Sequence, residues 1–331
     1  MKDVDLTQFQ FDYDLTWAAF FMNPDGAIYG RYGTRSVAGA MAHNSIESLK
    51  AAMKRALDLH DDYPANQASL AGKRGEEPRW KTALSIPALR RQFAKKLMQP
   101  TGKGNCIHCH NIHNGWIDTA YDEGNFDKQS IWIYPLPDNV GMPIDVDTGV
   151  VVERVIKDSF ADKAGIEAGD VIGAMNGQPI LSQADMQWVL HHLPNVATLE
   201  IQVERSGQAM TKTLSLSGDW KQSDISWRAS TWSIRPKLKI WTPELSDAEK
   251  AELGLASGDL ALRAKWINNP GAKEAGLKTG DIIVEADGKA EAMTPGQFNL
   301  WIKLTYQPGD KLPIKVLREN QKIALQIPLL Q

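Results

Sequence analysis

Apolar residues near the N-terminus follow the pattern of a β-hairpin and a helix. Residues 15–22 form an apolar run, which is typical of a buried strand. The turn sequence NPDG follows at 23–26, and residues 27–32 alternate as a second strand. Ser45, a favoured N-cap residue, then precedes apolar residues at helical spacing. The pattern predicts a hairpin and a helix within the first 60 or so residues.

The C-terminal half contains an internal repeat. Residues 164–172 read AGIEAGDVI and residues 275–283 read AGLKTGDII. An Asn-Gly or Asp-Gly pair follows each copy, and a helical pattern and two strand patterns come after it. The two copies are too far apart in the sequence for solenoid units, so the repeat predicts two domains of the same kind.

The repeated motif resembles the signature of PDZ domains of the bacterial, circularly permuted kind. Two PDZ-like regions would cover residues 138–218 and 236–331. The glycines of the motif permit tight turns with positive φ. The resemblance implies small barrels with an open strand edge, to which a peptide can add as an extra strand.

In such domains a carboxylate-binding loop precedes the strand that receives the peptide. The candidate loop of the first domain is VGMPI at 140–144, with Gly141, Met142 and Ile144 as peptide-binding residues. The candidate loop of the second domain is LGL at 253–255, with Gly254 and Leu255. Both loops depart from the GLGF pattern of many PDZ domains. The PDZ resemblance as a whole implies a protein or peptide as the ligand.

Composition narrows the class of protein further. Hydrophobic residues make up 43% of the 331 residues and charged residues 23%, which is typical of globular domains rather than disordered chains. The net charge of −3 argues against a protein that coats nucleic acid. No apolar stretch is long enough to predict a transmembrane helix, and the acidic N-terminus shows no signal peptide.

The two cysteines, Cys106 and Cys109, lie in the sequence CIHCH. A bridge over two residues would stabilise little, so a disulfide framework is excluded. The sequence fits C-x-x-C-H, the attachment pattern of c-type haem. In that reading both thiols form thioethers and His110 binds the iron as proximal ligand. The resemblance to monohaem cytochrome c covers residues 85–135, including a predicted basic helix ahead of the motif.

The sixth ligand of a haem iron is not specified by this pattern. Met142 is the candidate distal ligand, and Met98, His113 and His60 are alternatives. Two other chemistries remain open for the same cluster. Zinc could take the four ligands Cys106, Cys109, His110 and His113. A thiol–disulfide couple could also use the two cysteines, beside the positive charge of Lys103.

The N-terminal hairpin and helix resemble the second half of a thioredoxin-like domain over residues 6–60. The half that would carry a redox cysteine pair is missing. A thioredoxin-like part, a CIHCH segment and two PDZ domains together resemble a planctomycete-type family. The resulting α+β multidomain organisation is: 1–62 thioredoxin-like, 63–84 linker, 85–137 haem segment, 138–218 first PDZ domain, 219–235 linker and 236–331 second PDZ domain.

The sequence thus predicts a monohaem c-type protein for electron transfer or redox sensing, with PDZ domains that hold a partner. The alternatives are a PDZ scaffold with structural zinc and a thiol–disulfide accessory protein. Attached haem c would require export to the periplasm, from a chain whose signal has been trimmed; otherwise a cytoplasmic protein is expected. G-x-S-x-G and a Ser-His-Asp constellation are absent, and no range is free for a trypsin-like double barrel, so an HtrA-type protease is not predicted.

Overall fold

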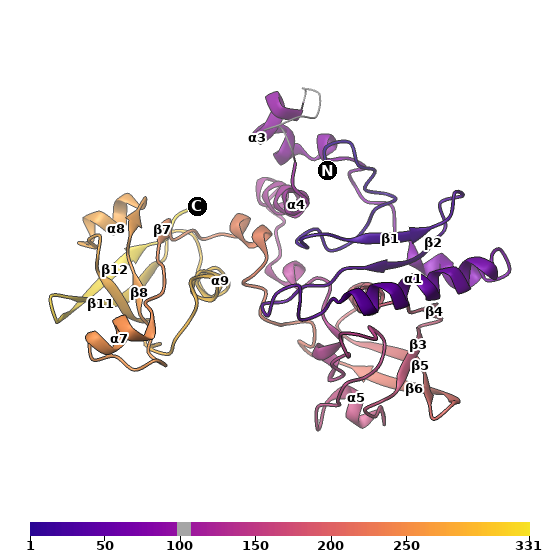
Figure 1. The fold of residues 1–331 in the computed structure, drawn as a ribbon. Coiled ribbons are helices and arrows are strands. Elements are labelled where there is room, and N and C mark those ends of the chain that lie inside the picture. The colour runs from indigo at the N-terminus through magenta and orange to yellow at the C-terminus, as the bar shows by residue number, and fades with distance from the viewer. Residues whose placement is uncertain (98–106) are drawn as a thin grey trace. The chain divides into compact units, whose positions relative to one another are not determined.

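The computed structural model describes residues 1–97 and 107–331 (Figure 1). The predictions that involve Met98, Lys103 and Cys106 lie outside the described residues. The chain divides into two compact units, residues 1–225 and 226–331. Both units mix helices with antiparallel sheets, so the α+β class is confirmed. No helix in the described part of the chain is long and apolar enough to cross a membrane.

The N-terminal hairpin and helix form where the sequence predicted them. Strands β1 (Ala19–Met22) and β2 (Ile28–Tyr32) pair antiparallel, and every residue of β2 is buried. Helix α1 (Ile46–Asp61) begins at Ser45, whose Oγ accepts a hydrogen bond from the Ser48 N–H at 3.1 Å. The cap supplies an acceptor for one of the amides that the first helical turn leaves free.

The polar stretch after α1 is attached to the protein through buried residues, although many of its residues are exposed. It contains the short helices α2 (Gln67–Leu70), η1 (Ala71–Lys73) and η2 (Ala83–Ser85). Leu70 joins a hydrophobic cluster with residues of β2 and α1, and the Lys73 side chain is fully buried. The segment predicted as a linker, residues 63–84, thus makes tertiary contacts through Leu70 and Lys73.

Helix α3 (Pro87–Leu97) packs against α4 (His110–Asp122), which follows the CIHCH sequence. Gly115 permits this close approach, because a Cβ atom there would lie 2.6 Å from Leu89 Cγ. Two short helices, η3 (Lys128–Ile131) and η4 (Pro137–Val140), lead from α4 into the next domain.

The remainder of the first unit is a small barrel-like domain. Its elements are α5 (Phe160–Lys163), β3 (Val171–Met175), β4 (Gln178–Pro179), α6 (Gln183–His192), β5 (Ala197–Arg205) and β6 (Gln208–Leu216). The sheet has the order β4-β3-β5-β6. Buried and exposed residues alternate along β5, as expected for a strand with one face on the core. Its core includes Met142, Ile172 and Leu199.

The second unit repeats this arrangement. Its elements are η5 (Ala229–Ser233), β7 (Ile240–Trp241), α7 (Asp247–Glu252), β8 (Leu262–Arg263), β9 (Trp266–Ile267), α8 (Pro270–Glu274), β10 (Ile282–Ala286), α9 (Pro295–Thr305), β11 (Lys311–Arg318) and β12 (Gln321–Pro328). The sheet order is β12-β11-β10-β8. Strand β10 and its counterpart β3 each shift register at equivalent positions against the following long strand.

The repeated motif has the same structural role in both units. The buried Asp170 accepts a bidentate pair of hydrogen bonds from Arg205, at 2.7 and 2.9 Å, and Arg205 also donates to Gly165 O. Asp281 and Arg318 reproduce this pair at 2.7 and 2.6 Å. Burial favours a raised pKa for Asp170, but the Arg205 guanidinium and the Glu167 amide outweigh it, so the pKa is lowered. The aspartate therefore fastens the glycine turn to the long strand.

A second buried ion pair joins the N-terminal part to α6. Lys73 Nζ lies 3.0 Å from Asp185 Oδ1, and both side chains are almost completely inaccessible to solvent. The Leu181 N–H donates to Asp185 Oδ2 at 3.0 Å, and the Arg31 N–H donates to Asp185 Oδ1 at 3.1 Å. A buried carboxylate with this many partners is costly to replace.

We expect Asp185→Asn to lower the free energy of unfolding by about 3–5 kcal/mol, because it leaves the buried Lys73 ammonium without a counter-charge. Urea denaturation measures the change. The double variant Lys73→Met/Asp185→Asn removes both charges and should recover part of the loss. The exposed pair Glu77–Lys81 provides the control, and Glu77→Gln should change little. Equal losses in D185N and E77Q would contradict the assignment.

Candidate functional site

The candidate peptide-binding strand of the first domain follows a left-handed turn at Gly141, which has φ +93°. The Ile156 N–H donates to Gly141 O at 2.9 Å. The Glu153 N–H donates to Pro143 O at 2.9 Å, and the Asp145 N–H donates to Val151 O at 2.8 Å. Residues 143 and 145 therefore direct their backbone groups towards the neighbouring segment. The backbone groups of Ile144, which lies between them, face the opposite edge.

The second unit contains the same hairpin. The Asn268 N–H donates to Lys239 O at 2.9 Å, and the Lys265 N–H donates to Trp241 O at 2.9 Å. This register makes Lys239 the counterpart of Gly141, and Lys239 also has a positive φ, of +51°. The backbone groups of Ile240, between Lys239 and Trp241, face away from β9. Within the described residues β7 pairs with β9 alone.

The loop predicted for the second domain, residues 253–255, lies elsewhere in the fold. Leu253 ends α7, Gly254 has φ +71°, and the Leu255 N–H donates to Lys250 O at 2.9 Å. Helix α7 is an insertion between the two strands of the hairpin, where the first domain has only a short turn. Because of this insertion, the loop equivalent to residues 140–144 lies farther ahead of the AGLKTGD motif in the sequence. Lys239 was therefore not identified from the sequence as part of that loop.

Of the residues predicted to hold a cofactor, the structure describes Cys109, His110 and Met142, and each has its own local surroundings. Met142 is fully buried in the hydrophobic core of the first PDZ-like domain. His110 Nδ1 is hydrogen-bonded to Asn114 Oδ1 at 2.9 Å, one turn along α4. Cys109 is partly buried, and burial raises the pKa of its thiol. A raised pKa disfavours the thiolate that metal binding and disulfide exchange require.

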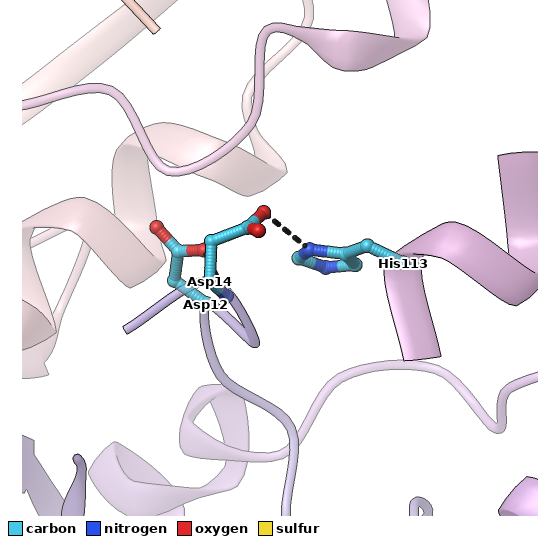
Figure 2. A group of neighbouring side chains, drawn as sticks. All are labelled: Asp12, Asp14 and His113. Carbon is cyan, nitrogen blue, oxygen red and sulfur yellow. Dashed lines mark hydrogen bonds and ion pairs between the residues drawn. The ribbon is translucent and has the colours of Figure 1, made fainter. Parts of the chain in front are cut away.

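One predicted ligand, His113, belongs to a different group of side chains (Figure 2). Its Nδ1 lies 2.9 Å from Asp14 Oδ2, and the Asp14 N–H donates to Asp12 Oδ1 at 3.1 Å. All three residues are buried, and one ligand atom from each lies within 4.8 Å of the others. The rings of Tyr13 and Trp116 flank the imidazole.

Carboxylate and imidazole groups at this spacing are donors that a divalent cation can use. The direct hydrogen bond from His113 to Asp14 also gives the group a structural role, since it joins the N-terminal segment to α4. Sequence analysis missed it because the two partners lie 99 residues apart. No local spacing signals such a pair.

Comparison with known proteins gives the first domain a family. Residues 138–216 match the family described as PDZ domain. A probable periplasmic serine endoprotease DegP-like of Pseudomonas savastanoi pv. phaseolicola is 29% identical over 214 residues, which are 63% of this chain and 41% of that protein. Periplasmic serine endoprotease DegP of Salmonella typhimurium is 34% identical over 146 residues, 44% of this chain and 28% of that protein.

A solved structure of an HtrA-type protease, AlgW with tripeptide, is 17% identical, covers 50% of this chain and 54% of its own, and has a TM-score of 0.25. The chain thus spans less than half the length of the two curated relatives described above.

These findings correct several sequence-based predictions. The planctomycete-type family was wrong, because the relatives are DegP-like endoproteases. The haem c redox function and the haem c cofactor were wrong for the same reason. The zinc and thiol–disulfide alternatives find no support in these relatives either. An HtrA-type protein was not predicted from the sequence, whereas these relatives are described as DegP or DegP-like serine endoproteases.

We expect Asp14→Asn to lower the free energy of unfolding by about 1–3 kcal/mol, because it weakens a buried hydrogen bond to His113 and disturbs its fixed surroundings. Thermal and urea denaturation measure the loss. Asp3→Asn, at an exposed position of the same segment, is the matched control. If both variants unfold like the parent protein, the pair does not hold the N-terminal segment on α4.

Proposed function

We propose that this protein binds the C-terminal segments of other proteins by adding them as a strand to a PDZ domain. The observation that carries the proposal is the hairpin shared by both units, in which a positive-φ residue precedes a strand whose alternate backbone groups face outwards. Strand addition satisfies such an edge with main-chain hydrogen bonds, and side-chain pockets add specificity.

We also propose that residues 226–331 are a second PDZ domain. The order of three strands (β10-β11-β12 against β3-β5-β6), the register shift in β10, the Asp281–Arg318 pair and the turn at Lys239 all have counterparts in the domain that matches the PDZ family. Similarity at these four levels supports a common architecture, although the second loop differs from the first in sequence and charge.

The charges at the two loops favour different ligands. In the first domain Asp138 lies two residues before the loop at 140–144, and a carboxylate there disfavours the terminal carboxylate of a peptide. In the second domain the equivalent segment, just before β7, carries Lys237 and Lys239, and the Lys239 side chain is exposed. Two ammonium groups beside the start of the strand attract a peptide C-terminus. The second domain is therefore the proposed site for a partner with a free C-terminal carboxylate.

The printed names of the relatives place them in the periplasm and describe them as serine endoproteases. We propose a periplasmic location for this chain as well. We base the activity on its PDZ part, because the described residues form two four-stranded and two two-stranded sheets and we assign none of these to a protease barrel. Peptide recognition is thus the proposed function, and proteolysis is not.

We expect full-length protein to bind labelled decapeptides with an apolar C-terminal residue, and to bind their C-terminal amides about tenfold more weakly. Fluorescence anisotropy at low and high salt measures both affinities, and salt should reduce the difference. The variant Lys237→Glu/Lys239→Glu should lose about tenfold for the free acid and little for the amide.

The control is Lys278→Glu/Lys311→Glu, which makes the same change in net charge at exposed positions away from the loop. Its affinity should match that of the parent protein. Equal affinity for acid and amide peptides, or equal losses in the two double variants, would overturn the assignment of the second loop.

A further inference from the structure

We infer that the peptide groove of the first PDZ domain is closed by a segment of this same chain, residues 34–45. This inference rests on the proposed function, because it assumes that the edge at Ile144 and helix α6 are the walls of a peptide site. It adds that the first site already holds an internal occupant, so that an external peptide must displace it.

Two elements form the walls of this groove. One wall is the strand edge at Ile144, whose backbone groups face away from the 150–153 segment. The other wall is helix α6. Helix η4 leads into the loop at Gly141 and packs against α6. A peptide that started at the loop and paired with Ile144 would therefore run alongside α6.

Residues 34–45 contact both walls and the loop. Thr34 Oγ1 donates a hydrogen bond to Gln187 Oε1 of α6 at 2.9 Å. Ser45 Oγ donates to Val146 O, just beyond the strand edge, at 3.3 Å. His43 is hydrogen-bonded to Gln183 at the start of α6 and is close enough to Asp138 of η4 for the two side chains to interact electrostatically. Residues 34–45 thus contact α6 at two positions and the chain just beyond the strand edge at one.

The closing segment has a fixed conformation of its own. Asn44 Nδ2 donates to Thr34 O and to Ala40 O, both at 2.6 Å, and the Thr34 N–H donates to Asn44 Oδ1 at 3.1 Å. His43 Nε2 is hydrogen-bonded to Ser36 Oγ at 2.8 Å. The two ends of the segment are thus held together, as in compact Ω-loops. A preorganised loop loses little conformational entropy when it occupies a site.

The strand before this segment is anchored on α6. Ser182 Oγ donates to Arg31 O at 2.6 Å, and the Arg31 guanidinium lies 3.6 Å from the ring centre of Trp188. Gly30 packs so closely that a Cβ atom there would lie 2.6 Å from Asp185 Oδ2. On the other side of the segment, Arg55 donates to Leu181 O at 2.9 Å and also to Thr148 O. Both ends of the segment are therefore fixed to the domain that it covers.

The second unit, which is described completely, has no counterpart of this segment within residues 226–331. There α9 is contacted by the segment just before the hairpin: Lys303 Nζ donates to Thr231 O at 2.8 Å. The equivalent contact in the first domain is the stacking of Tyr134 on His191. Residues 34–45 are an additional layer on the first domain.

A variant that loosens the segment tests the inference. Thr34→Val/His43→Ala removes the contacts to α6 and the loop without touching the groove walls. Met41→Ala is the matched control, because Met41 lies in the same segment and is 83% exposed. Amide hydrogen exchange by mass spectrometry follows residues 140–146 and α6 in each full-length protein, and circular dichroism verifies that each is folded.

We expect T34V/H43A to exchange at least tenfold faster than the parent protein over 140–146, and M41A to exchange like the parent. Calorimetry with the amidated decapeptide, which lacks the terminal carboxylate that Asp138 disfavours, should find one site per chain in the parent and two in T34V/H43A. Unchanged exchange in T34V/H43A, or two equal sites in the parent protein, would overturn the inference. Absence of peptide binding in every variant would count against the proposed function, while the exchange data would still decide whether the segment covers the groove.

Discussion

The buried carboxylate of Asp185 is the constraint on which the first unit depends. It lies on α6, the helix that borders the proposed groove, and it is satisfied from three sides by Lys73, the Arg31 amide and the Leu181 amide. Burial lowers the pKa of Lys73, and the adjacent carboxylate opposes that effect. Because a charge in this environment needs its partners, the N-terminal part cannot leave α6 without a large cost in free energy. The position of residues 34–45 over the groove follows from this attachment, since β2 delivers the chain directly to them.

Features that depend on neighbours in the sequence could be predicted. The hairpin, the helix after Ser45 and the repeated glycine motif are all encoded by local periodicity, a capping residue and turn residues. The same reasoning failed where a partner lies far away in the sequence. Lys73 lies in a stretch rich in polar residues and glycine, yet it is buried because α6 supplies Asp185, and the Trp188 indole N–H of the same helix donates to Gly72 O. No sequence feature within ten residues of Lys73 predicts that contact.

The CIHCH sequence shows the opposite failure. Its local pattern matches a haem-attachment motif, but the match is not specific enough to predict haem binding. A five-residue motif occurs by chance, and its chemistry depends on a structural context that a short pattern does not contain. In the structure the side chains of α4 have separate partners: His110 is bonded to Asn114 and His113 to Asp14. Of the three histidines in this stretch, His113 alone is hydrogen-bonded to the N-terminal segment, His110 is bonded within α4, and His108 is exposed. The relatives, which are described as endoproteases, agree with this interpretation.

The two units show how one scaffold can acquire different binding properties. Both keep the aspartate–arginine pair that fastens the glycine turn, because the barrel requires it. The differences lie where a ligand would meet the domain. Asp138 lies beside one loop and two lysines beside the other. Residues 34–45 lie across the first groove, and residues 226–331 contain no such segment for the second. An attached occupant competes at an effective concentration in the millimolar range, for which a free peptide must compensate with higher affinity. An acidic loop that repels a terminal carboxylate suits an internal segment, which has no such group, whereas a basic loop suits the end of another chain.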